Sequence, residues 1–222
     1  SDILTNHLQE LGGNEANVAT GYHAIEFLLW GQDLNIKNGP GNRLFTDYSL
    51  TECTNDNCDR RRMYLDSVTN LLVSDLKEMA NNWSSDGKAR KILLTNGFDK
   101  GINSIITGMG SLSYGELAGE RMKLGLMLHD PEEEHDCFSD NTHNSHFYDA
   151  LGIQNIYLGR YKRMDGSLMD GPSISELIKN KNKILDNKIK EALENTILKM
   201  SKIVDRAKNI EPYDQMIAEG NV

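Results

Sequence analysis

The sequence has no long apolar run and fewer basic than acidic residues, and both shortages limit what the protein can be. No apolar stretch approaches the roughly 20 residues that a membrane-spanning helix needs, so we expect no transmembrane segment. Lys and Arg number 24 against 33 Asp and Glu, for a formal net charge of -9. This balance argues against a nucleic-acid partner and suits a protein that handles cations.

Cysteine is also scarce, with three in the chain. Cys53 and Cys58 enclose a polar, turn-forming stretch that could close a small disulfide loop, and Cys137 is left over. Because a C-x4-C pair without a second pair is poor evidence for zinc, we predict a disulfide, with two reduced thiols as the alternative. A disulfide would indicate an exported, oxidising location. The chain opens on Ser1 without a signal peptide, and this absence says little if the chain is a mature or trimmed product.

No segment shows the sustained apolar and polar alternation of a strand, whereas apolar residues at helical spacing recur along the chain. We therefore predict an all-α fold. The predicted helical regions are residues 18–30, 59–83, 92–109, 114–129 and 174–204. Residues 32–58 and 130–172 are predicted to be long ordered loops, which in compact helical domains are often functional.

The first helical region contains His23 and Glu26, three residues apart. At about 100° per residue this spacing places both on one helix face, where an imidazole nitrogen and a carboxylate oxygen could bind one metal ion. A surface pair or a core histidine is the alternative. The chain has no H-E-x-x-H, and Phe27 after Glu26 excludes H-x-x-E-H, so the standard zinc-peptidase motifs are absent.

A second cluster, residues 132–146, holds three histidines and five carboxylates. Within it, Glu132 and His135, and again Asp140 and His143, repeat the three-residue spacing. Mixed oxygen and imidazole ligands suit iron, zinc or manganese better than calcium or copper(I). The alternative is a solvated acidic loop whose histidines cap helix ends.

Glu116 and Glu120 lie four residues apart in a predicted helix, with Arg121 adjacent. If they face the interior of a bundle, they could complete a metal site with ligands from other helices. If they face solvent, they form an acidic surface that Arg121 neutralises. Cys137 or Ser139 beside a histidine is poor evidence for a catalytic nucleophile.

These motifs resemble those of the imelysin family, which has been classed as a peptidase family and includes iron-regulated proteins of bacterial envelopes. Several long motifs in one order are more specific than H-x-x-E alone. The resemblance rests on Gly21-x-His23-x-x-Glu26 with its continuation through residues 27–33, and on residues 43–48, 115–122 and 134–143.

The resemblance implies two helical bundles related by duplication, with the functional site between them. On this interpretation residues 1–85 are the remainder of the first bundle and residues 86–222 form the second. Family members are typically longer, so the chain looks trimmed at both ends.

The resemblance also implies a metal site built on His23 and Glu26, facing the segment 134–143 with Glu116 and Glu120. The expected further ligands are Glu120, Glu134, His135, Asp140 and His143. The expected pocket residues are Glu116, Arg121, Ser139 and Asn141.

We therefore expect an exported protein, periplasmic or associated with the outer membrane, that binds a divalent or ferric metal ion, iron or zinc, or a metal-bearing ligand. Iron acquisition is the function that the resemblance favours. One alternative is a metallopeptidase in which Glu26 or Glu120 is the general base toward a metal-bound water. The other is an envelope interaction module that binds a non-metal ligand.

Overall fold

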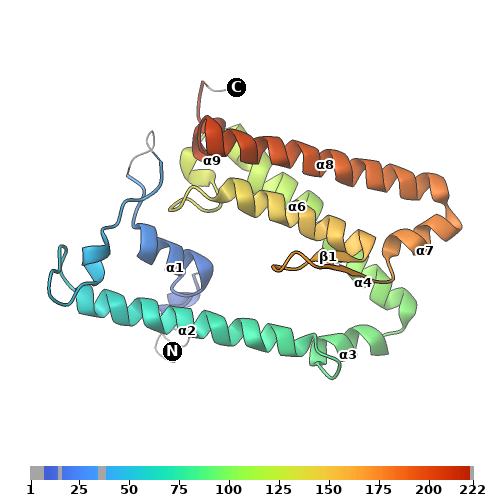
Figure 1. Ribbon diagram of the computed structural model, residues 1–222, viewed down its shortest axis with the longest axis horizontal. Helices are drawn as coiled ribbons and strands as arrows, with labels where there is room; N and C mark the ends of the chain where they lie inside the picture. The colour runs from blue at the N-terminus through green and yellow to red at the C-terminus, as the bar shows by residue number, and fades with distance from the viewer. Residues whose placement is uncertain (1–7, 15–16, 35–38, 221–222) are drawn as a thin grey trace. The chain divides into compact units, whose positions relative to one another are not determined.

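The computed structural model describes residues 8–14, 17–34 and 39–220, and most of them are helical (Figure 1). The chain divides into two compact units, residues 1–96 and 97–222, and each has its own hydrophobic cluster. Within the described ranges, no helix has both the length and the apolar composition to cross a membrane. A bundle boundary at residue 85 and an internal duplication stay predictions.

The first unit begins with short helices and continues into one long helix. The predicted end of the first helix at Gly31 is confirmed, since Gly31 has a φ of 79°, in the left-handed region that favours glycine after a helix. The predicted end of the second helical region, at residue 83, is also confirmed, because that helix ends at Asn82. The elements are the 3-10 helices η2 (Leu11–Gly13) and η3 (Phe45–Tyr48), and the α-helices α1 (Gly21–Trp30), α2 (Cys58–Asn82) and α3 (Lys88–Thr95).

Helix α1 packs against α2 through the buried side chains of Leu28 and Val68. The Tyr64 hydroxyl of α2 donates a hydrogen bond to Ala19 O at 2.6 Å, just before α1 begins. This bond and the apolar contact fix α1, which carries the predicted His23 and Glu26, against a long and regular helix.

The loop between α1 and α2 is organised by Asp47, which is 2% exposed. Its carboxylate accepts a hydrogen bond from Asn55 Nδ2 at 2.8 Å and pairs with Arg43 Nη1 at 3.3 Å. Cys53 and Cys58 form a disulfide, which confirms the predicted pairing. Polar contacts and one covalent bond therefore order residues 43–58 of this loop.

The second unit is built mainly from helices, with one short hairpin. Its elements are α4 (Phe98–Gly110), η4 (Ser111–Lys123), α5 (Leu124–Leu128), η5 (Pro131–Glu133), α6 (Thr142–Leu158), β1 (Arg160–Lys162), β2 (Leu168–Asp170), α7 (Ile174–Lys181), α8 (Lys183–Asn209) and α9 (Tyr213–Ile217). The two strands pair antiparallel, with Arg160 opposite Asp170. The sequence showed no strand because three-residue strands are too short for alternation to appear.

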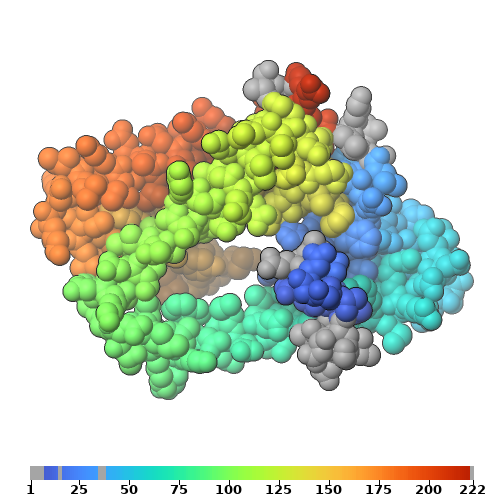
Figure 2. Space-filling view, turned by 180° about the vertical axis from the view of Figure 1, so that it is seen from behind, coloured from blue at the N-terminus to red at the C-terminus, as the bar shows by residue number. Residues whose placement is uncertain are grey.

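Helices α4 and η4 form one continuous rod across the face of the second unit (Figure 2). Element η4 winds as a π-helix, in which each backbone N–H bonds the carbonyl five residues back instead of four. Leu117 of η4, Ala150 of α6 and Met200 of α8 form the buried apolar cluster of this unit. This cluster holds η4 and α8 against α6.

Helix α6 corrects the prediction that residues 130–172 form a long loop. The buried face of α6 starts with a threonine, a histidine and an alanine, so the apolar periodicity on which the prediction relied is missing. The buried residues of this helix are Thr142, His146, Ala150, Ile153 and Tyr157.

Asp186 of α8 is buried and links three helices. Its carboxylate accepts hydrogen bonds from Lys190 Nζ at 2.8 Å, Ser175 Oγ at 2.8 Å and Tyr157 Oη at 2.9 Å. These bonds, the one from Lys190 foremost, hold the pKa of Asp186 below its usual value, whereas burial alone would raise it. Asp186 is therefore a satisfied structural carboxylate that joins α6, α7 and α8.

Replacing Tyr157 by Phe should test this network. The ring stays, but Asp186 loses one donor, so we expect the free energy of unfolding to fall by about 1–3 kcal/mol. Urea denaturation measures this change. Tyr148→Phe is the matched control, because Tyr148 lies on the same helix and is 64% exposed. Equal stability of the two variants would show that the network contributes little.

Candidate metal centre

In the first unit, α1 presents His23 and Glu26 together, as the spacing predicted. His23 Nδ1 lies 2.9 Å from Glu26 Oε2. Glu26 is 9% exposed, whereas the His23 side chain is 40% exposed. Histidines that bind metals through one ring nitrogen commonly donate the other N–H to a carboxylate, which fixes the tautomer and the ring orientation. This pair has that arrangement, with Nδ1 toward Glu26.

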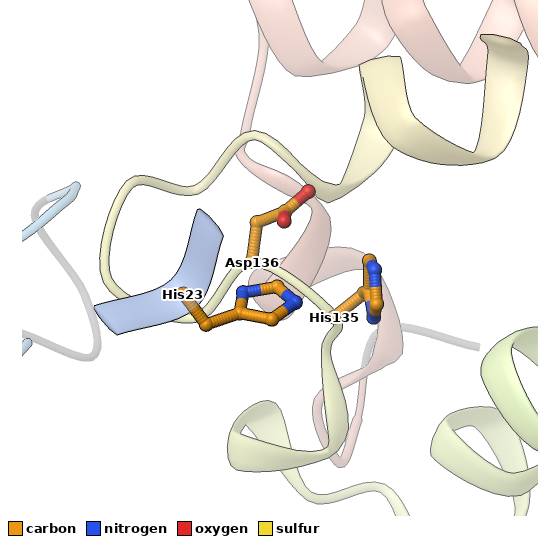
Figure 3. Close-up of side chains that lie close together, drawn as sticks. All are labelled: His23, His135 and Asp136. Carbon is orange, nitrogen blue, oxygen red and sulfur yellow. The ribbon is translucent and has the colours of Figure 1, made fainter. Parts of the chain in front are cut away.

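In the second unit, the loop between η5 and α6 carries His135 and Asp136 next to each other; Figure 3 labels both, together with His23 of α1. The loop is fixed by Thr142, which has no exposed surface. Thr142 Oγ1 accepts a hydrogen bond from Asp136 N at 2.8 Å and donates one to Glu134 Oε2 at 2.8 Å. Ser145 Oγ also donates a hydrogen bond to Asp136 Oδ2. The first turn of α6 therefore sets the position of both flanks of His135.

Glu134 is buried beside several carboxylates, and this environment favours its protonated form. Burial raises the pKa of Glu134 to about 9, although the hydrogen bond from Thr142 opposes the shift. The carboxylates of Asp140, Asp214 and Asp136 contribute to this upward shift. In the metal-free protein at neutral pH, Glu134 is therefore a neutral acid.

The histidines of α6 are neutral as well. Burial foremost, together with electrostatic interactions with His135 and Arg121, lowers the pKa of His146 to about 4. Burial also lowers the pKa of His143. Among the described residues, His146 Nδ1, His146 Nε2 and His143 Nδ1 are buried without a hydrogen-bond partner. A neutral imidazole can coordinate a metal without first losing a proton.

The remaining predicted residues of the segment 134–143 differ in exposure. Asp140 is 7% exposed and has a φ of 53°, a left-handed conformation that aspartate tolerates better than most residues. Ser139 and His143 are half-buried, and Asn141 is exposed. The tight backbone at Asp140 turns the loop into the start of α6.

The predicted carboxylates of η4 lie on its solvent side. Glu116, Glu120 and Arg121 are all exposed, and Arg121 Nη2 lies 3.8 Å from Glu116 Oε2. In an α-helix of about 100° per residue, positions five apart would point about 140° apart. The five-residue hydrogen-bond spacing of η4 instead brings these two side chains together.

Sequence reasoning did not select four residues that the structure places around the loop. Asp136 and His146 lay inside the cluster of residues 132–146, and that membership was the available signal. Thr142 and Ser145 gave no signal, because they act through contacts that depend on α6 being a helix. The resulting donor set combines imidazoles with carboxylates, which suits transition metals that accept nitrogen and oxygen.

The neutral state of Glu134 gives a testable pH dependence for the metal-free protein. Because the folded-state pKa of Glu134 is raised, its contribution to stability is complete below pH 4.5 and is lost as the pH rises toward 9. The loss is at most about 1.4 kcal/mol per pH unit for one group. Glu134→Gln, which stays neutral, should therefore lose less stability than the wild type between pH 5 and 8.

Urea denaturation at several pH values, with a chelator present, measures this difference. Glu132→Gln is the matched control, because Glu132 is an exposed carboxyl of the same segment. Parallel pH profiles for the wild type and Glu134→Gln would contradict the prediction.

Comparison with known proteins adds the family. The family model described as imelysin, a peptidase family, matches residues 1–221. No curated protein matches the chain. The matched range includes α1 with His23 and Glu26, the loop with His135 and Asp136, and nearly all of the rest of the sequence. The chain belongs to the imelysin family.

Proposed function

We propose that the protein binds one metal ion through His23, His135 and Asp136, and that it takes part in iron acquisition at the cell envelope. The observation that carries the proposal is that one candidate ligand in each unit has a second side chain that orients it by a polar contact. Glu26 holds His23, and Ser145 holds Asp136. Such outer partners typically accompany metal ligands.

The chemistry of these side chains fits iron or zinc. Two imidazoles and one carboxylate form a mixed nitrogen and oxygen set, which suits these ions better than calcium or copper(I). In this proposal Glu26 orients His23, because it already contacts the Nδ1 atom. A bound ion would supply a positive charge that binds and polarises oxygen ligands.

Other predicted residues take supporting places in the proposal. Asp140 of the loop and His143 in the first turn of α6 are further ligands, and Glu120 is the candidate that η4 contributes. Glu134 would have to lose its proton to bind an ion. It can therefore act as a ligand only if the metal displaces that proton.

The export to an oxidising compartment is supported by the disulfide between Cys53 and Cys58. Disulfides persist in the periplasm and outside cells and are rare in the reducing cytosol. Family membership and the acidic composition are compatible with cation handling outside the cytoplasm.

Metal titration of three variants tests the proposal. His23→Ala, His135→Ala and Asp136→Asn should each weaken binding of Zn²⁺ or anaerobic Fe²⁺ by more than about 100-fold, beyond the 10–100-fold expected for an outer partner. Glu26→Ala should fall within that smaller range. Calorimetry should give one ion per chain in the wild type.

Glu132→Gln is the control for loss of a side chain outside the proposed ligand set, because Glu132 is an exposed carboxyl of the same segment as His135 and Asp136. Wild-type affinity in all three ligand variants would refute the metal site. Two ions per chain, each lost with a different variant, would show that the units bind separately. Chelator-sensitive cleavage of a generic peptide, lost in Glu26→Ala, would assign the metallopeptidase alternative instead.

A further inference from the structure

His146 is an unusual residue for its position on the buried face of α6. It is 1% exposed, and within the described part of the chain neither of its ring nitrogens has a hydrogen-bond partner. Burying a polar group without a hydrogen bond costs free energy that an aliphatic side chain would avoid. Packing against neighbouring rings, and not hydrogen bonding, therefore fixes the imidazole of His146 in place.

Those contacts are with two other rings. The Tyr213 ring meets the His146 ring edge to face, with centroids 5.2 Å apart and planes at 89°. The His135 ring stacks on the His146 ring at a centroid distance of 6.4 Å and an interplanar angle of 27°. Both distances lie in the 4.5–7 Å range in which ring pairs attract. The order of the contacts is Tyr213, His146, His135.

The Tyr213 end of this series is firmly anchored. Tyr213 is 3% exposed, and Ile217 at the other end of α9 is 1% exposed. Ile217 packs so closely on Gly125 that a Cβ there would lie 3.2 Å from Ile217 Cδ1. His129 Nδ1 lies 3.3 Å from Ile217 O. Helix α9 is thus held by α5 and the turn that follows α5.

We propose that His146, backed by Tyr213, positions the imidazole of His135 by ring stacking. The inference deepens the proposed function, on which its value for metal binding rests. Hydrogen bonds already fix the backbone beside His135 and the side chain of Asp136, and the stack fixes the ring itself. A preoriented imidazole binds an ion without first losing rotational freedom.

Two pairs of variants separate ring stacking from other roles of these residues. His146→Phe and Tyr213→Phe keep a flat ring, whereas His146→Leu and Tyr213→Leu remove it. The first measurement is the imidazole ¹H–¹⁵N spectrum of the metal-free protein, which reports the surroundings of the His135 ring whether or not the protein binds a metal. The second is Zn²⁺ affinity.

We expect both Leu variants to shift the His135 ring resonances and to lower Zn²⁺ affinity by about 10-fold, the effect of an outer partner. The Zn²⁺ affinity of both Phe variants should stay within about 3-fold of that of the wild type, well below the loss expected for an outer partner. Phe147→Leu is the matched control. It removes a ring from the next position of α6, where Phe147 packs on the Leu117 and Met200 cluster, and should leave His135 unchanged.

Unchanged His135 resonances in folded His146→Leu and Tyr213→Leu would overturn the inference. Equal loss of affinity in His146→Phe and His146→Leu, with Tyr213→Leu at wild-type affinity, would also overturn it, because His146 would then act through a nitrogen. A wild type that binds no Zn²⁺ would refute the proposed function, and the spectra of the metal-free variants would still decide whether the stack orients His135.

Discussion

The buried hydroxyl of Thr142 is the interaction on which the candidate site depends most. It joins the backbone of Asp136 to the side chain of Glu134, and so fixes the loop on both sides of His135. Thr142 is also the first residue of α6, so the loop is tied to the element that packs on α8 and η4. The packed helices thereby hold in place a loop that has little apolar sequence of its own.

The interior behind this loop favours neutral groups. Burial raises the pKa of Glu134 to about 9 and that of Tyr213 to about 12, and lowers the pKa of His146 to about 4. All three are uncharged at neutral pH. The half-buried His135 and Asp136 lie beside these neutral groups, and the carboxylates of the buried Asp140 and Asp214 would offset the charge of a bound cation.

The sequence predicted the helical class, the His23–Glu26 pair and the disulfide, because each depends on local geometry. A three-residue separation within a helix, or four residues between two cysteines, can be interpreted from the sequence without knowing the tertiary fold. Helix α6 was missed because Thr142 and His146 occupy buried positions where an apolar residue would have shown the period. The roles of Ser145, His146 and Tyr213 depend on contacts between residues up to 67 positions apart, as between His146 and Tyr213, and no local pattern encodes them.

The π-helical winding of η4 changes the interpretation of its two carboxylates. The spacing argument assumed an α-helix, in which Glu116 and Glu120 are equivalent neighbours on one face. With hydrogen bonds spaced by five residues, the guanidinium of Arg121 comes within 3.8 Å of the Glu116 carboxylate and partly neutralises its negative charge. A cation that recruited Glu116 would have to displace the guanidinium. Of the two, Glu120 is therefore the carboxylate that η4 can offer at the lower electrostatic cost.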